Sequence, residues 1–271
     1  MINYPKTTLP NVVRNELELA RLIQQSTYPA RIPAVEGYAV LGDTQPASWS
    51  NGDFYDAVGL MARQGQPGFV LDRRESVENL LLVLGDATGH GTGPALIATE
   101  LRAIIRASIR LGVSHRNLTR CMNDQLCEDL PDGHFITLLM GRLNLERHMF
   151  RWVSFGQAPL FFYSARNHQV QMLEAHQPPL GLLPSAADYT PTETFFEPGD
   201  AFLVLSDGYM ETANAHQELW GAERAAEVLR TQASHGPAAV LQALLREVNA
   251  FAAGQPQQDD RTFLMILRQS D

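Results

Sequence analysis

The sequence contains only two cysteines, Cys121 and Cys127, and their spacing is not that of a CxxC pair. Two cysteines cannot build a disulfide framework, so we expect both to act as small apolar groups on or near a helix in a reducing compartment. No apolar run approaches the ~20 residues that a membrane span needs. The first residues also lack the basic and apolar pattern of a secretory signal. These absences predict a cytoplasmic protein without membrane insertion.

Positive charge is scarce as well. Lysine and arginine total 21 against 30 aspartates and glutamates, which gives a formal net charge of −9. Nucleic acids and anionic membranes favour clustered basic residues, so this composition argues against both partners. With 45% hydrophobic and only 19% charged residues, the 271-residue chain is not disordered. The surplus of acid leaves another use open, which is the binding of cations.

Helical spacing of apolar residues occurs in four parts of the chain. The predicted helices cover residues 11–26, 94–111 and 118–130, and a region at 222–253 that is broken at 235–237. Between them lie short apolar runs rich in β-branched and aromatic residues, which are typical of strands. The runs are YAVLGD, AVGLMA, GFVLD, NLLLVLGD, FITLLMGRL, FRWVSFG, LFFY, AFLVLSDG and RTFLMIL. Strands in runs, with helices inserted in pairs, predict an antiparallel α+β fold.

Aspartates stand at the ends of predicted strands in four places. They are Asp53 and Asp56 in NGDFYD, Asp86 in GDATGHGTG, Asp207 in SDG, and Asp259 with Asp260 before TFLMIL. Aspartate is a common turn residue, which explains any one of these motifs alone. Neighbouring strands, however, bring residues that are distant in sequence within a few ångströms of each other. Four such motifs in one chain therefore favour a shared acidic site at one end of a sheet.

Carboxylates that gather in a cleft repel one another, and bound divalent cations remove that repulsion. Mg²⁺ and Mn²⁺ prefer oxygen ligands such as carboxylates and water. Two such ions about 3.5–4 Å apart hold a bridging hydroxide and draw charge from a phosphoryl group. The acidic motifs therefore predict a divalent metal site.

Other catalytic motifs are missing. The loop GDATGHGTG is not a P-loop, and Pro94 stands where GxGxxG needs its third glycine. The sequence has no HExxH, no GxSxG and no Cys-x5-Arg nucleophile loop. His90 lies within the candidate site, where it would either donate a proton or hold the loop in place.

The motifs NGDFYD, GDATGHG, SDGYMET and DDRT, in this order, resemble the metal-dependent protein phosphatases of the type 2C (PPM) superfamily. The most similar branch is that of the SpoIIE-like or RsbU-like bacterial serine phosphatases. The resemblance runs from about Glu18 to Leu267 and includes ELARLIQQSTYPARIP, which is similar to the helix and proline turn that precede this domain. Each motif is weak alone, but four in the right order and spacing are specific.

The resemblance implies two packed antiparallel sheets flanked by helices, in α-β-β-α layers, with two divalent ions (Mn²⁺ or Mg²⁺) at one end. In this family pattern Asp86 bridges both ions, and the backbone carbonyl of Ala87 completes one coordination shell. Asp207 and Asp259 hold the second ion, and Asp53 is an inner or outer ligand. Asp86, Asp207 and Asp259 are thus the implied catalytic residues. A metal-bridging hydroxide attacks phosphorus and displaces serine or threonine without a phosphoenzyme.

The resemblance also implies partners. Members of this branch dephosphorylate phosphoserine on a small anti-anti-sigma (STAS) protein in a partner-switching circuit. We divide the chain into an N-terminal helical arm at residues 1–33 and a phosphatase domain at residues 34–271. The helix at residues 11–26 then either binds a sensor or activator protein, pairs with a second copy as a homodimer, or packs along its own domain.

Two departures from the family pattern leave alternatives open. Asn51 replaces the first of two glycines before DFYD, and Gln157 stands where the family often has a histidine near the rim of the active site. Neither change removes an implied metal ligand. The lost histidine keeps a second interpretation open, a pseudophosphatase that acts as a docking module. A third is a phosphohydrolase of small phosphate esters or nucleotides, which the few basic residues beside the motifs disfavour.

Overall fold

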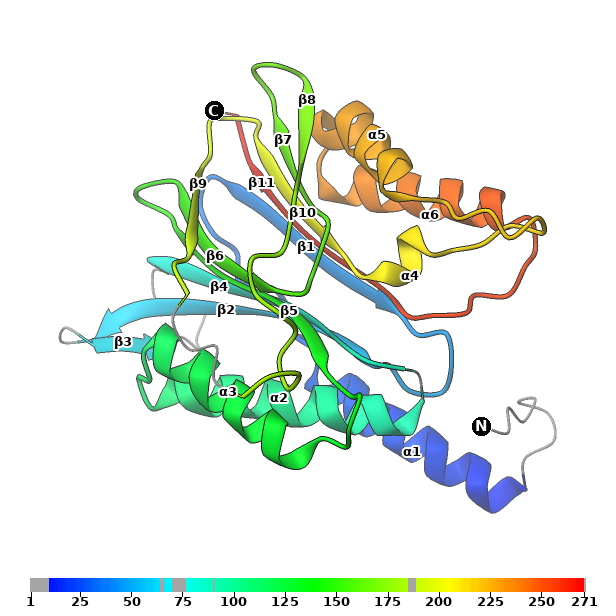
Figure 1. Cartoon of the computed structure of the whole chain (residues 1–271). Coiled ribbons are helices and arrows are strands. Elements are labelled where there is room, and N and C mark those ends of the chain that lie inside the picture. The colour runs from blue at the N-terminus through cyan, green and yellow to red at the C-terminus, as the bar shows by residue number, and fades with distance from the viewer. Residues whose placement is uncertain (1–9, 64–65, 70–76, 90, 185–188, 271) are drawn as a thin grey trace.

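The computed structural model describes residues 10–63, 66–69, 77–89, 91–184 and 189–270. Figure 1 shows two sheets packed face to face, with helices covering the outer face of each. The helices are α1 (Asn11–Thr27), α2 (Thr92–Arg110), α3 (His115–Asp129), α4 (Asp207–Met210), α5 (Ala222–Gln232) and α6 (Pro237–Ala252), with a 3₁₀ turn at Ala233–His235. The strands are β1 (Tyr38–Gln45), β2 (Asp53–Arg63), β3 (Gln66–Phe69), β4 (Asn79–Ala87), β5 (Ile136–Asn144), β6 (Met149–Phe155), β7 (Leu160–Ser164), β8 (Gln169–Leu173), β9 (Thr192–Phe195), β10 (Ala201–Leu205) and β11 (Arg261–Arg268).

Both sheets are antiparallel. One has five strands in the order β1-β11-β10-β7-β8, and the other has six in the order β3-β2-β4-β5-β6-β9. Strand β11 lies between β1 and β10, so it is an inner strand of its sheet. Strand β4 likewise lies between β2 and β5. The predicted antiparallel α+β fold, with α-β-β-α layers, is confirmed.

Three apolar layers hold the fold together. The middle layer lies between the two sheets and includes Leu82, Leu84 and Phe202. A second layer joins the six-stranded sheet to α2 and α3, and a third joins the five-stranded sheet to α5 and α6. Because both sheets are covered on both faces, their inner strands are continuous apolar runs such as AFLVL in β10, which is buried at all five positions.

The predicted helices agree with the structure to within about three residues at their ends, but three short elements were not predicted. Strands β8 and β9 lie at sheet edges, and all their residues are exposed or half-buried, so no apolar run marks them. Helix α4 has only four residues. Both cysteines lie on α3 as expected, but the expectation of an apolar role is wrong for Cys121, which is exposed to solvent. No helix in the described ranges is long and apolar enough to cross a membrane.

The N-terminal helix α1 lies beside α2, and its first turns extend past the end of α2 (Figure 1). One buried residue, Gln24, attaches it to the body of the protein. The side-chain amide of Gln24 donates to the carbonyl oxygen of Asn51 (2.6 Å) and accepts from the N–H of the same residue (3.0 Å). The hydroxyl of Tyr28 donates to the carbonyl oxygen of Asp53 (3.0 Å). Helix α1 is therefore bonded to the backbone of the NGDFYD motif.

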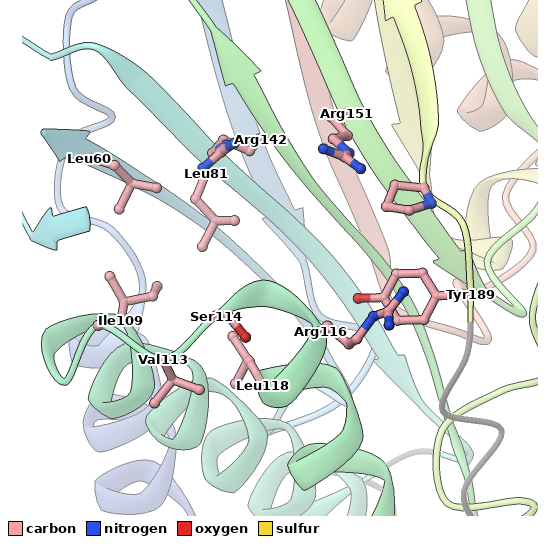
Figure 2. Close-up of a pocket in the computed structure, with 12 residues that line it drawn as sticks. Leu60, Leu81, Ile109, Val113, Ser114, Arg116, Leu118, Arg142, Arg151 and Tyr189 are labelled. Carbon is pink, nitrogen blue, oxygen red and sulfur yellow. The ribbon is translucent and has the colours of Figure 1, made fainter. Parts of the chain in front are cut away.

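The turn between α2 and α3 leaves a gap against the outer face of the six-stranded sheet. A pocket of about 400 Å³ opens there (Figure 2). It lies at the end of β4 that is opposite to Asp86, because Leu81 lines it and stands five residues earlier on the strand.

Candidate metal centre

The first two acids meet on neighbouring strands of the six-stranded sheet. Asp53 begins β2 and Asp86 lies near the end of β4, and the two are direct cross-strand partners. Side chains alternate between the faces of a strand. Phe54 and Val83 point towards α2 and α3, so Asp53 and Asp86 lie on the opposite face, which packs against the other sheet. This pairing brings two carboxylates together that are 33 positions apart in sequence.

The other two acids come from the five-stranded sheet. Strand β10 ends at Leu205 and Asp207 begins α4, while Asp259 lies two residues before β11. Ser206 joins these segments, because its N–H donates to the carbonyl oxygen of Thr262 (2.9 Å) and its hydroxyl accepts from the N–H of Thr262 (2.8 Å). Asp207 and Asp259 are thus held at the same end of the fold as the first pair.

Glycine 208 makes this arrangement possible. A Cβ atom at Gly208 would lie 2.0 Å from the carbonyl oxygen of Asp260, which is far too short for a non-bonded contact between carbon and oxygen. Only a residue without a side chain lets the turn after Asp207 approach the segment that carries Asp259.

We expect Gly208→Ala to lower the free energy of unfolding by at least about 2 kcal/mol, since the contact is with backbone that must move. The same shift separates Asp207 from Asp259, so activity should fall more than about tenfold. The matched control is Gly93→Ala in α2, where a Cβ meets nothing within 4 Å. Thermal unfolding and phosphatase assays of both variants check this. An unchanged melting temperature and rate in Gly208→Ala would contradict the assigned contact.

Burial and mutual repulsion alter the acidity of these carboxyl groups. Burial, with added repulsion from Asp259, Asp260 and Glu211, raises the pKa of Asp86 to about 6. Burial and the charges of Asp86 and Asp259 raise the pKa of Asp207 to about 7. The pKa of Asp53, which is 1% exposed, is raised well above its ordinary value by burial and by the charge of Asp86. The four acids therefore form one electrostatically coupled cluster drawn from both sheets.

This cluster has the donor chemistry that a divalent cation needs. Within the described part of the chain, the buried Oδ2 atom of Asp53 has no hydrogen-bond partner. A Cβ at Gly52 would lie 3.1 Å from the carbonyl oxygen of Ala87, so the missing side chain keeps that oxygen from being crowded. No three histidine, cysteine, aspartate or glutamate side chains among the described residues converge closely enough to form a complete metal site. The residues fit Mg²⁺ or Mn²⁺ in type and charge, with backbone oxygen and water as further ligands.

Two other acids of the motifs have structural tasks. Asp260 accepts hydrogen bonds from the N–H groups of Ala47 and Gly52, both at 2.7 Å, and so holds the loop before Asp53. Burial raises the pKa of Asp260, and these two hydrogen bonds oppose the shift. Asp260 therefore positions the NGDFYD motif from the other sheet.

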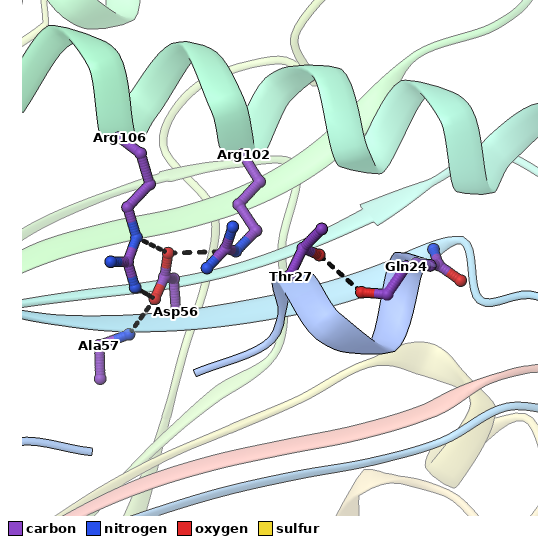
Figure 3. Close-up of polar contacts among 6 residues, drawn as sticks. All are labelled: Gln24, Thr27, Asp56, Ala57, Arg102 and Arg106. Carbon is purple, nitrogen blue, oxygen red and sulfur yellow. Dashed lines mark hydrogen bonds and ion pairs between the residues drawn. The ribbon is translucent and has the colours of Figure 1, made fainter. Parts of the chain in front are cut away.

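Asp56 does not join the acidic cluster, although it belongs to the same motif as Asp53. It lies three positions further along β2 and so points to the opposite face, towards α2. There the fully buried carboxylate forms ion pairs with Arg102 (3.3 Å) and with Arg106, which donates from two nitrogens (Figure 3). The NGDFYD motif therefore contributes Asp53 to the acidic cluster and Asp56 to a buried ion-pair network, because a strand alternates its faces.

Gln157 is buried rather than placed on a rim, since it is only 3% exposed. Its side-chain nitrogen donates to the carbonyl oxygen of Leu205 (2.8 Å), and its side-chain oxygen accepts from the hydroxyl of Thr137 (3.0 Å). Thr137 is the cross-strand partner of Asp86, and Leu205 lies two residues before Asp207. Gln157 thus links the two sheets beside the acids. The other candidate near the site, His90, lies outside the described residues.

Sequence reasoning missed Glu211. This exposed residue follows α4, and its N–H donates to the carbonyl oxygen of Asp207 (2.7 Å). Its charge contributes to the raised pKa of both Asp86 and Asp207. The sequence does contain a signal for it: Glu211 follows Asp207 by four residues in SDGYMET, and residues at this spacing are neighbours on a helix.

Comparison with known proteins places this chain in a family. The model of the family described as stage II sporulation protein E (SpoIIE) matches residues 76–269. The protein "Phosphoserine phosphatase RsbU" of Bacillus subtilis (strain 168) is 25% identical over 199 residues, which are 73% of this chain and 54% of that protein. The chain spans about half the length of the curated relatives that it matches.

Solved structures share the fold. The structure titled "SiaA-PP2C domain of Pseudomonas aeruginosa" superposes with a TM-score of 0.74 at 22% identity, covering 96% of this chain and 98% of that chain. A structure of RsbX in complex with magnesium superposes with a TM-score of 0.56 at 13% identity, covering 88% of this chain and 98% of that one. These similarities establish the two-sheet phosphatase fold for this chain.

Proposed function

Because the chain belongs to the stage II sporulation protein E (SpoIIE) family, we propose that it is a metal-dependent serine/threonine protein phosphatase that hydrolyses phosphoserine on a partner protein. One observation carries the proposal: buried carboxylates from both sheets gather at one end of the fold, where burial and, after it, the charges of neighbouring acids raise the pKa of Asp207 to about 7. Divalent cations neutralise such a cluster. The curated name of the relative RsbU, a phosphoserine phosphatase, supports the substrate class.

In the proposed site, Asp86 would help to hold both ions, together with the carbonyl oxygen of Ala87. Asp207 and Asp259 would hold the second ion, and Asp53 would hold or orient the first. When bound, two divalent ions activate a water and withdraw charge from the phosphoryl group. The chain itself contributes the fixed positions of these oxygen atoms, since each acid stands at or beside the end of a packed strand.

Two other functions, a docking module and a hydrolase of small phosphate esters, fit the site less well. A pseudophosphatase that acts only by docking would not need a buried, mutually repelling set of acids, whose only evident gain is cation binding. A hydrolase of nucleotides or other small phosphate esters would need a cationic clamp for the phosphates. In the described residues, the arginines nearest to the NGDFYD motif, Arg102 and Arg106, face away from the acids and are paired with Asp56. The phosphoprotein phosphatase is therefore favoured.

The deciding assay uses p-nitrophenyl phosphate and a serine-phosphorylated STAS protein, each with Mn²⁺, with Mg²⁺ and with a chelator. We expect turnover of both substrates with added metal and a loss of at least about 10³-fold on chelation, since metal-ion catalysis supplies several kcal/mol of transition-state stabilisation. Re-addition of metal is the control for irreversible damage. Turnover that survives chelation would overturn the metal mechanism, and metal binding without turnover of any phosphoprotein would favour the docking module.

The partner in this proposal is a phosphorylated STAS-domain anti-anti-sigma protein, as the sequence resemblance implies. A phosphoserine on a folded domain presents a dianion next to neutral backbone, which suits a divalent metal site in an otherwise acidic protein. Comparison of kcat/KM for the intact phosphorylated domain and for a short phosphopeptide of the same sequence tests this. Equal values would mean that the folded partner is not recognised.

Helix α1 is proposed as the surface that binds a sensor or activator protein, or a second copy of the chain. Large apolar side chains are exposed along it, and Val12, Leu19 and Ile23 are 70%, 58% and 58% exposed. Their spacing of seven and four residues places them on one face of the helix, as in helices that pair. A partner on this face would act on the site through Gln24, which is bonded to Asn51 two residues before Asp53.

Charge on this face should abolish the pairing. We expect Ile23→Glu to shift the chain to a smaller species in sedimentation, or to remove activation by the partner, because it buries a charge in an apolar seam. Gln25→Glu is the matched control, since it adds the same charge at an exposed position on the other side of the helix. If both variants behave as the wild type, α1 packs only along its own domain.

A further inference from the structure

The pocket beneath the α2–α3 turn has an apolar floor. Five side chains form this floor, from strands β2 and β4 and from the two helices with their turn: Leu60, Leu81, Ile109, Val113 and Leu118. Leu81 and Leu118 are 3% and 2% exposed, so the deepest part belongs to the packed core. The volume of about 400 Å³ is within the range of small-molecule sites in proteins.

Three arginines surround this apolar floor. Arg142 on β5 and Arg151 on β6 are direct cross-strand partners, both exposed, and Arg116 lies in the first turn of α3 (Figure 2). Like charges directly opposite each other destabilise a sheet, and the ion pair that Arg151 forms with Glu193 is long (3.7 Å). This clustering is unusual in a chain whose net charge is −9. An anion bound between Arg142 and Arg151 would relieve their repulsion.

The pocket is separate from the carboxylate cluster. Leu81 and Asp86 stand five residues apart on β4, which places them about 17 Å apart along the strand. Their side chains also point to opposite faces of the sheet, since Leu81 packs against α2 and α3. A molecule in the pocket therefore cannot contact the site of the proposed reaction, and its binding can be measured whether or not the proposed function is correct.

We propose that this pocket binds a small amphiphilic anion. Its apolar chain or ring would lie on the apolar floor, and its carboxylate or similar anionic head would bind Arg142 and Arg151. One water occupies about 30 Å³ of liquid, so the volume holds roughly 13 heavy atoms. A medium-chain carboxylate has this size. The arginine pair sits at one edge of the apolar floor, so the apolar part of the ligand can lie on the floor while its anionic head meets the guanidinium groups.

The test is calorimetric titration of the full chain with decanoate, decanol and decylammonium, all kept below their micelle concentrations. We expect saturable binding of decanoate with one site per chain. Binding of decanol should be about tenfold weaker, since charge-assisted hydrogen bonds are lost, and decylammonium should not bind. The double variant Arg142→Gln/Arg151→Gln should also bind decanoate about tenfold more weakly. Its matched control is Arg166→Gln/Arg246→Gln, which removes the same charge at exposed positions far from the pocket. Arg166 forms an ion pair with Glu197, as Arg151 does with Glu193, so each double variant loses one such pair.

A second variant tests the apolar part. Val113→Trp in the α2–α3 turn fills the pocket without changing its charges and should abolish decanoate binding, while the melting temperature confirms that the variant is folded. The proposal is overturned if decanoate does not bind saturably, if decanol binds equally well, or if the arginine variant and its control are indistinguishable. It is also overturned if the arginine variant changes the oligomeric state, because the pocket would then be an interface with a second copy.

Discussion

Asp86→Asn should abolish phosphatase activity and at the same time make the metal-free protein more stable. In the proposed site Asp86 would help to hold both ions, so its loss should lower kcat by at least about 10³-fold. In the metal-free protein, however, the charged carboxylate is buried among other acids, and an asparagine removes that repulsion. A residue that lowers stability but is retained for activity is the expected signature of a functional site.

The stability gain should depend on pH in a defined direction. Burial raises the pKa of Asp86 in the folded state to about 6, above its ordinary value of 3.8. Between these values the folded state binds more protons than the unfolded state, so stability falls as pH rises. With a chelator present, wild type and Asp86→Asn should melt together near pH 4 and separate above about pH 6. Added Mn²⁺ should reverse the order, because it stabilises only the wild type. Full activity in the variant would refute the assignment.

Asp56→Asn should have the opposite pair of effects, although Asp56 is in the same motif as Asp53. It removes the charge of Asp56 from the partly buried Arg102 and Arg106, and breaking a buried ion pair in this way costs about 3–5 kcal/mol. The melting temperature should therefore fall by roughly 10 °C. At temperatures well below that transition, kcat should stay close to the wild-type value, because the side chain lies on the face of β2 away from the acids.

The matched control for Asp56 is Glu227→Gln on α5, which removes one partner of a fully exposed pair with Arg230. This variant should melt with the wild type, since exposed pairs contribute little. The double variant Asp56→Leu/Arg106→Met should regain part of the lost stability, because a buried ion pair can be replaced by packed apolar groups. Loss of activity in Asp56→Asn with an unchanged melting temperature would show that Asp56 acts in the site.

The sequence predicts the structure best where the pattern within a single strand is sufficient. The run before Asp86 is apolar at every position because β4 is covered on both faces, so the strand and its acidic end were both predictable. Strands β8 and β9 carry no such run, since they are exposed edge strands, and pattern alone could not find them. The packing of two sheets came from the resemblance of four motifs and not from periodicity.

The candidate site was less predictable, because its contacts cross between sheets. No local pattern says that Asp53 pairs with Asp86, which the register of β2 and β4 decides. The motif groups Asp53 with Asp56, and only the start of β2 at Asp53 shows that the two point to opposite faces. Gln157 was noted only as a missing histidine, whereas its bonds to Thr137 and Leu205 depend on how the sheets meet. The sequence does not show, for the same reason, that the carboxylate of Asp260 accepts a hydrogen bond from the backbone N–H of Gly52.

The position of β11 has a consequence for how the protein folds during synthesis. Tyr38 pairs with Arg268 across more than 200 residues, and β11 is the strand that joins β1 to β10. The five-stranded sheet therefore cannot close until residues 261–268 have left the ribosome, and contacts of such high sequence separation form slowly. Until then the apolar face that belongs between the sheets is uncovered, which exposes the nascent chain to aggregation. Asp259 lies two residues before β11 and emerges with it, so a nascent chain whose residues 259–268 are still inside the ribosome should be unable to bind metal or hydrolyse its substrate.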